Sequence, residues 1–458
     1  MDKIQLLQER KTAVLAAGKE LRDQIKALID ADSFVELSTF SFSKNDFYGQ
    51  EIAGEGVVTG FATIDGYPFY VVGQNFAEMQ GGVSKANCDK IAKCLDAAKK
   101  NATPVVYLLN THGVQVGEGV TVLEGLADVF MKSTRLKGEV LQYAIVNGDV
   151  YGSAAMLAAI ADFAFFVKGK GVLAINSPFV LSAKAGKNLP KENVGGYAAL
   201  TNIGVNAMEV DDLADAKAKI LDLSSIFSGA IIDAELNASL PALNENVTAE
   251  NVLSVMDNYV EFGGNCEKEV KTLVGRIGGI PVSALVFDGG ENGVELTEAK
   301  LAKINRLLSL AYDFNLPFVV FADVKGIAPC MQVNNSGVMR QAAEYLSGVE
   351  ALNVMGIPKI SVIYKKAIGL GYSLFGAKSV GFDYTCAFAN ASIGLFDGPQ
   401  GAQIELNDEK ADKAALAARY STENTDPIHA AKNGYIDGII DPQFVKQYLI
   451  ASLQMLVK

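Results

Sequence analysis

The chain contains a near-copy of itself, and this internal repeat limits its fold more than any other feature. Three pairs of landmarks in the two halves are each separated by 213 positions: Pro68 and Pro281, Pro104 and Pro317, and Gly113 and Gly326. The last two pairs bound the apolar runs Pro104–Gly113 and Pro317–Gly326. One interval shared by independent landmarks indicates a duplicated fold. We therefore expect two homologous domains, covering residues 1–225 and 226–458.

Each half is expected to contain the same order of elements. A strand pair precedes a helix, such as 87–100 or 297–314, and an apolar strand follows that helix. A loop, a second helix, a second apolar strand, a glycine turn and a third helix complete the half. Strands that are apolar on both faces and alternate with helices indicate a buried sheet between helical layers. The predicted fold class is therefore α/β, with two tandem domains.

Composition excludes several classes of function. The chain has 52 acidic and 40 basic side chains, and this negative balance disfavours nucleic-acid partners. Two histidines, His112 and His429, and five scattered cysteines without a CxxC pair predict no metal site. The first thirty residues are of mixed charge, and the apolar segment Leu141–Val167 contains acids and glycines. We therefore expect a cytoplasmic protein with neither a secretory signal nor a membrane span.

Glycine turns after the apolar strands are the candidate binding sites. They lie at 110–115 and 148–154 in the first half, and at 323–337 and 367–372 in the second. Open α/β sheets bind ligands beyond the carboxyl ends of their strands. Glycine lets a backbone N–H approach a ligand closely, and two such groups can stabilise an oxyanion. The alternative is that these glycines serve only turn geometry or packing.

Side chains offer few catalytic candidates. His112 lies in one of these loops and could act as a general base, although no Ser–His or Cys–His motif surrounds it. A polar contact is the alternative role for this histidine. His429 lies near a predicted helix start, and Asp323 and Asp383 near strand ends have no paired carboxylate. Cys330 is expected to be an inert small residue.

At these residues the sequence resembles the carboxyltransferase subunits of biotin-dependent acyl-CoA carboxylases and of sodium-pumping acyl-CoA decarboxylases, in the crotonase superfamily. The resemblance extends from Leu28 to Pro442 and is clearest in five segments: Val57–Pro68, Gly117–Gly119, Val274–Val282, Phe314–Pro317 and Pro358–Ile363. It implies two crotonase-like (ClpP/crotonase) domains in tandem, as the repeat independently predicts.

The resemblance also implies a reaction that relies on backbone N–H groups instead of a side-chain base. An acyl-CoA thioester would bind the first domain, with its enolate oxygen held at Gly152 and Ser153. Biotin would bind the second domain, with its ureido oxygen held at Leu370 and Gly371. Further substrate-binding positions implied by the family are Gly81, Gly82, Gly113, Gly326, Gly337, Gly369 and Ser373. Ser373 occupies the position at which family members discriminate between acyl groups.

Partner proteins follow from the same resemblance. The chain has no Met-Lys-Met tripeptide for biotin attachment, so biotin is expected on a separate biotin carboxyl carrier protein. A biotin carboxylase or membrane decarboxylase subunits would complete the system, which could hold the chain at a membrane surface. Family members form homo-hexamers whose active sites lie between the first domain of one chain and the second domain of another.

Three functions remain open, and the sequence departs from the family pattern at several of these positions. Asn110–Gln115 reads Asn-Thr-His-Gly-Val-Gln, where the family has Asp-Ser-Gly-Gly-Ala-Arg. The first turn is Gly-Ser instead of Gly-Gly, and the second is Ile-Gly-Leu-Gly instead of Tyr-Gly-Gly-Ala. The leading hypothesis is carboxyl transfer between a short acyl-CoA and biotin. The alternatives are the α subunit of a sodium-pumping decarboxylase of the methylmalonyl-CoA or glutaconyl-CoA type, and a non-catalytic scaffold that pairs with an active paralogue.

Overall fold

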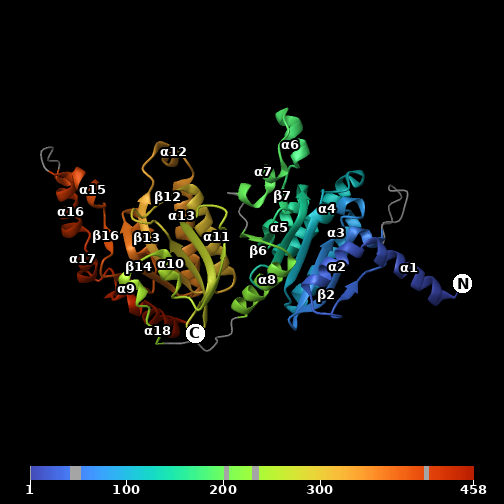
Figure 1. Cartoon of the computed structure of the whole chain (residues 1–458), viewed down its shortest axis with the longest axis horizontal. Coiled ribbons are helices and arrows are strands. Elements are labelled where there is room, and N and C mark those ends of the chain that lie inside the picture. Colours follow the sequence, from blue (N-terminus) through green and yellow to red (C-terminus); the bar gives the residue numbers. More distant parts are fainter. Residues whose placement is uncertain (1, 42–52, 201–205, 229–236, 407–411, 458) are drawn as a thin grey trace. The chain divides into compact units, whose positions relative to one another are not determined.

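The chain forms two compact units, Met1–Ser224 and Ser225–Lys458, and each contains its own sheet and core. The structure, a computed structural model, describes residues 2–41, 53–200, 206–228, 237–406 and 412–457. Figure 1 shows a sheet flanked by helices in each unit. No helix within these described ranges is both long enough and apolar enough to cross a membrane.

The first unit is built on a mixed sheet of order β1-β2-β3-β4-β5-β6-β8, with β7 paired to β5. The first three strands are antiparallel and the others are parallel. The strands are β1 Val35–Leu37, β2 Val57–Ile64, β3 Tyr67–Gln74, β4 Val105–Thr111, β5 Gln142–Tyr151, β6 Phe163–Val167, β7 Val172–Ala174 and β8 Ala207–Val210. The helices are α1 Lys3–Ala17, α2 Lys19–Leu28, α3 Lys85–Asn101, α4 Val120–Thr134, α5 Met156–Ile160, α6 Pro178–Ala185, α7 Lys191–Gly195 and α8 Leu213–Phe227.

The second unit repeats this plan with the order β9-β10-β11-β13-β14-β15-β17, while β12 pairs with β13 and β16 with β14. The strands are β9 Asn258–Phe262, β10 Val270–Ile277, β11 Ile280–Phe287, β12 Val294–Leu296, β13 Phe318–Ile327, β14 Lys359–Ile368, β15 Tyr384–Phe388, β16 Ser392–Gly394 and β17 Gly438–Ile440. The helices are α9 Ala242–Glu245, α10 Ala249–Leu253, α11 Glu298–Asp313, α12 Met331–Asn334, α13 Val338–Met355, α14 Leu370–Phe375, α15 Gly398–Gly401, α16 Lys413–Asn424, α17 Pro427–Lys432 and α18 Val445–Leu456. The α/β fold class predicted from the repeat is confirmed.

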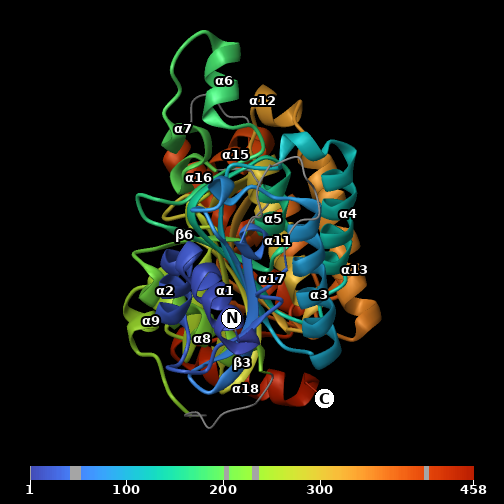
Figure 2. The same cartoon turned by 90° about the vertical axis from the view of Figure 1, so that its right-hand side faces the viewer.

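Helices α3 and α4 pack side by side on the first sheet, as Figure 2 shows, and α11 and α13 form the equivalent pair in the second unit. The repeat includes a buried lysine at the same position of α3 and α11, namely Lys90 and Lys303. The Lys90 Nζ donates to the Val57 carbonyl at 2.6 Å, and the Lys303 Nζ donates to the Cys266 carbonyl at 3.0 Å. Burial lowers the pKa of both ammonium groups to about 8.

Both sheets carry the same irregularity between their two central parallel strands. In the first unit Leu109 pairs with Val146 and Thr111 pairs with Val150. Three residues of β5, Asn147–Asp149, therefore lie opposite Asn110 alone. Such a bulge bends the strand and redirects its side chains.

The second unit has the corresponding bulge. Ala322 pairs with Ile363 and Val324 pairs with Ala367, so Tyr364–Lys366 lie opposite Asp323. Each bulge ends just before a candidate glycine turn. The two sheets therefore present charged side chains of opposite sign at this place, Asp149 in the first unit and Lys366 in the second.

Candidate functional site

The turn that follows β5 exposes one backbone donor in the first unit. Gly152 has φ +70°, a conformation that favours glycine, and begins the short 3-10 turn Gly152–Ala155. Its own N–H donates to the Ile175 carbonyl at 3.2 Å. The N–H of Ser153 follows in the first turn, where no intrahelical acceptor exists. Of the two predicted donors, Ser153 is thus the available one, and Gly152 sets the backbone geometry.

The loop 110–115 packs directly against this turn. A Cβ on Gly152 would lie 3.7 Å from the Gly113 Cα, and one on Gly113 would lie 3.5 Å from the Tyr151 carbonyl oxygen. Gly81 and Gly82 pack closely against this loop. A Cβ on Gly81 would collide with Asn110, and a Cβ on Gly82 would collide with Gln115. The structure therefore brings five predicted positions together at the carboxyl end of β5: Gly81, Gly82, Gly113, Gly152 and Ser153.

The turn after β14 is built in the same way in the second unit. Gly369 has φ +55°, and its N–H donates to the Gly394 carbonyl at 2.9 Å. A Cβ on Gly326 would lie 3.9 Å from the Leu370 nitrogen, so the end of β13 approaches this turn as Gly113 approaches the first. The equivalent of Gly152 is thus Gly369, and the Leu370 N–H corresponds to that of Ser153.

Gly371 lies one residue beyond this donor position and serves packing. A Cβ on Gly371 would lie 2.7 Å from the Val324 Cγ1, so the residue is glycine because α14 lies close to β13. Gly337 also has a local role. It precedes α13, and its N–H donates to the Glu298 carboxylate at 2.8 Å.

A cavity of about 470 Å³ opens over the second turn. Its lining combines the turn with β16, α17 and the residues that directly follow each of them: Gly369, Leu370, Tyr372, Ser373, Ile393, Gly394, Leu395, His429, Ala430, Asn433 and Tyr435. Three predicted positions, Gly369, Leu370 and Ser373, belong to this lining, whereas Gly326, Gly337 and Gly371 do not. Sequence reasoning missed the contributions of Tyr372, Asn433 and Tyr435. An aromatic or amide residue in or just after a helix has no sequence signature that relates it to a distant turn.

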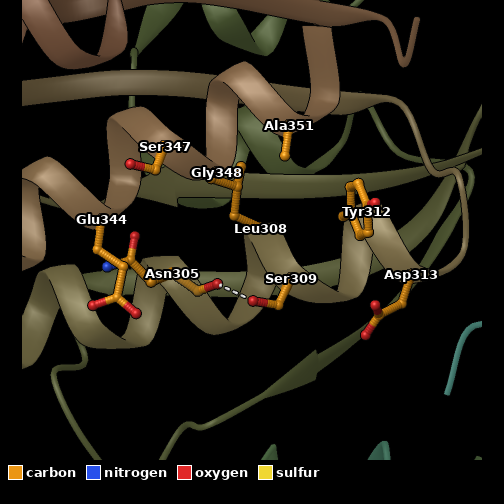
Figure 3. A pocket seen from close by; sticks show the side chains of 9 residues that line it. All are labelled: Asn305, Leu308, Ser309, Tyr312, Asp313, Glu344, Ser347, Gly348 and Ala351. Atoms are coloured by element: carbon orange, nitrogen blue, oxygen red, sulfur yellow. Dashed lines mark hydrogen bonds between the residues drawn. The ribbon is translucent and has the colours of Figure 1, made fainter. Parts of the chain in front are cut away.

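A second hollow of about 330 Å³ lies between α11 and α13 (Figure 3). Its lining includes Asn305 and Ser309, whose hydroxyl donates to the Asn305 carbonyl at 3.0 Å. None of the predicted site residues contributes to it. Across the described residues, no group of three or more His, Cys, Asp or Glu side chains is arranged to hold a metal ion.

The second bulge surrounds a buried acid. Asp323 is fully buried; one carboxylate oxygen accepts the Gly289 N–H at 3.2 Å, and the other, Oδ1, has no hydrogen-bond partner. Burial raises the pKa of this carboxyl to about 6, although Lys365 and Lys366 lower it in part. These lysines themselves donate to the carbonyls of Gly290 and Glu291 at 2.8 and 2.7 Å.

Asp323→Asn is therefore expected to stabilise the protein at neutral pH. The folded-state pKa lies above the ordinary value of 3.8, so the stability linked to this group is complete below about pH 4 and is lost as the pH rises through about 6. Removing the charge should raise the free energy of unfolding at pH 7.5 by about 1–3 kcal/mol. Urea titrations of both proteins at pH 4 and 7.5 measure this difference. Equal stabilities at pH 7.5 would contradict it.

The chain belongs to the carboxyl transferase domain family, whose model matches residues 13–458. Among its relatives are the methylmalonyl-CoA decarboxylase subunit alpha of Veillonella parvula, 28% identical with 99% of this chain and 96% of the relative covered. The propionyl-CoA carboxylase carboxyltransferase subunit of Haloferax mediterranei is 27% identical, again with 99% and 96% covered. The fold of this chain is similar to that of transcarboxylase 12S, a hexamer solved with methylmalonyl-coenzyme A bound. The TM-score is 0.90 at 23% sequence identity, and 99% of this chain and 95% of the transcarboxylase chain are covered. The crotonase-like fold and the family suggested by the sequence are thus confirmed.

Proposed function

We propose that this chain is the carboxyltransferase subunit of a biotin-dependent system and moves a carboxyl group between a short acyl-CoA and biotin on a separate carrier protein. The observation that carries this proposal is the duplicated turn. Each unit has a backbone N–H just beyond a parallel strand, beside a glycine at or just beyond the end of the neighbouring strand. Two equivalent oxyanion sites suit a reaction in which both partners develop negative charge on a carbonyl oxygen.

The acyl thioester is assigned to the first unit. The Ser153 N–H would donate to the thioester oxygen as the enolate forms, and the packed loop at Gly113 would hold this donor in place. A fixed donor accelerates the reaction because no reorganisation is needed when charge develops. Gly81 and Gly82 would maintain the loop, so they act through its position.

Biotin is assigned to the second unit because the residues there suit it. The cavity combines apolar side chains, Leu370, Ile393 and Leu395, with the aromatic rings of Tyr372 and Tyr435. Such walls fit a compact bicyclic ring with an aliphatic tail, and the Leu370 N–H can donate to a ureido oxygen. When bound, biotin supplies a nitrogen that accepts or releases the carboxyl group. Leu370 is 43% exposed, so its side chain is free to form part of this wall.

Incubation of the purified chain with methylmalonyl-CoA and free biotin tests the proposal. We expect propionyl-CoA and carboxybiotin to appear together, in equal amounts and only when both substrates are present. Mass spectrometry measures both products. A folded protein that binds no CoA ester and transfers nothing from methylmalonyl-, malonyl- or glutaconyl-CoA would contradict the proposal and favour the scaffold alternative.

A second candidate is the decarboxylating direction of the same half-reaction, as in the α subunit of a decarboxylase pump. The Veillonella relative supports it, because its name describes that activity. We also propose a homo-hexamer, by analogy with transcarboxylase 12S. Biotin carboxyl carrier protein would be a partner in either case. A biotin carboxylase or membrane decarboxylase subunits would complete the system and decide its direction.

A further inference from the structure

A cluster of polar and aromatic side chains surrounds His112 beside the first turn. The imidazole stacks on Tyr151, with ring centroids 5.6 Å apart, and meets the edge of Phe76 at 5.0 Å. Its Nδ1 lies 3.1 Å from the Gln80 Oε1, and its Nε2 lies 3.8 Å from the Asp149 Oδ2. Two segments of the first unit, 76–80 and β5, therefore hold this ring in one orientation.

One tautomer of His112 leaves Nε2 as the nitrogen that can accept a proton. When Gln80 accepts from Nδ1–H, the lone pair of the neutral ring lies on Nε2, the nitrogen that faces Asp149. The carboxylate would stabilise the ring once Nε2 is protonated. His112 remains 38% exposed at its side chain, so its proton can exchange with water. Imidazole is also the side chain best suited to either protonation state near neutral pH.

The position of His112 relates the cluster to the proposed acyl site. His112 directly precedes Gly113, which packs against Tyr151 and Gly152. Asp149 and Tyr151 belong to the strand that ends at the turn. In the family loop that Asn110–Gln115 resembles, glycine stands at the position of His112. The imidazole therefore adds a titratable group to a site otherwise made of backbone donors.

We propose that His112 is a catalytic acid–base residue that moves the α-proton of the acyl thioester, oriented by Gln80 and supported by Asp149. This proposal rests on the proposed function of the first unit. The Cα–H bond breaks and its proton goes to the His112 Nε2. The electron pair moves into the thioester carbonyl to give the enolate, whose oxygen accepts from the Ser153 N–H. Return of the proton to Cα restores the thioester.

Other charged groups around the ring modulate this step. Asp149 also accepts from the Lys191 Nζ at 2.9 Å, so its negative charge is partly shared. Burial raises the pKa of Tyr151, and the neighbouring Asp149 carboxylate raises it further, so Tyr151 stays neutral at physiological pH. Gln80 and Phe76 carry no charge. The ring thus faces one carboxylate, one lysine bound to that carboxylate, and one neutral phenol.

Deuterium exchange into propionyl-CoA in the absence of biotin tests the proposal, because it follows the α-proton alone. We expect the wild-type chain to incorporate deuterium from D₂O. His112→Gln should slow this exchange about 100-fold or more, the usual contribution of a general base. The affinity for propionyl-CoA, measured by calorimetry, should be retained.

His112→Gly provides the second arm, because the family loop has glycine at this position and the fold should tolerate it. We expect added imidazole to restore exchange in this variant and not in His112→Gln, where the side chain fills the space. Asp149→Asn should lower the rate less than either substitution. Asp211→Asn is the matched control. It removes a carboxylate from an exposed ion pair with Lys168 and should leave exchange unchanged.

The outcomes separate this proposal from the proposed function. Carboxyl transfer by a wild-type chain that shows no exchange above the buffer rate would overturn the role of His112 and leave the carboxyltransferase standing. Exchange that persists in His112→Gln would do the same. A wild-type chain that neither binds CoA esters nor transfers carboxyl groups would overturn both.

Discussion

Gly152→Val is expected to abolish carboxyl transfer, with a loss of about 100- to 1,000-fold or more in rate. Gly152 adopts φ +70°, where a β-branched residue is strained, and a Cβ would lie against the Gly113 Cα. The turn must therefore change its backbone, and the Ser153 N–H moves with it. A shift of about 1 Å in a positioned group is enough to cost about two orders of magnitude. Initial rates with methylmalonyl-CoA and biotin measure the loss.

A control separates this effect from general strain. Gly66 has φ +79° in the hairpin between β2 and β3, and a Cβ there would meet nothing within 4 Å. Gly66→Val should cost a similar amount of stability, about 1–3 kcal/mol, because both substitutions force a side chain into the left-handed region. We expect this variant to keep its transfer rate. Unchanged turnover in a folded Gly152→Val would remove this turn from the proposed site.

Gly369→Val is the corresponding change in the second unit, and its expected result is different. It should abolish transfer to biotin while the affinity for propionyl-CoA remains that of the wild type. Gly369 has φ +55°, and a Cβ there would lie 3.3 Å from the Leu395 carbonyl oxygen. The substitution therefore disturbs the Leu370 donor and one wall of the cavity. Calorimetry with propionyl-CoA and a transfer assay with biotin together distinguish the two units.

Gly356→Val is the matched control for this unit. Gly356 ends α13 with φ +71° and open space around it, so the strain is similar and the cavity is untouched. Transfer should survive this change. If Gly369→Val weakened binding of propionyl-CoA and left transfer to biotin intact, the assignment of substrates to the two units would be reversed.

The repeat made much of the fold predictable because its landmarks fall where strands begin and end. Pro68 and Pro281 lie at the second position of β3 and β11, Gly113 lies two residues beyond β4, and Gly326 is the penultimate residue of β13. The interval of 213 residues holds as far as β4 and β13, and it then changes to 217 because the second half has four additional residues before β14. A sequence comparison that uses one interval cannot place the later turns correctly.

The strand register also shifts one part of the site prediction by one residue. Leu370 and Gly371 were paired with Gly152 and Ser153, whereas the strand register pairs Gly369 with Gly152. The side chains that surround His112 could not be predicted from the sequence either. Its partners come from the bulge at Asp149 and from the turn at Gln80, and a bulge is set by the pairing of two strands. The periodicity of either strand alone does not reveal it.

A structure of the chain with a bound non-reactive analogue of an acyl-CoA tests the central claim most directly. We expect the thioester oxygen to lie within about 3.2 Å of the Ser153 nitrogen, a normal hydrogen-bond distance. The reactive carbon should face His112, and the cavity beside Leu370 should remain free for biotin. An analogue bound in the second unit, with its thioester at Leu370 and none at Ser153, would contradict the account.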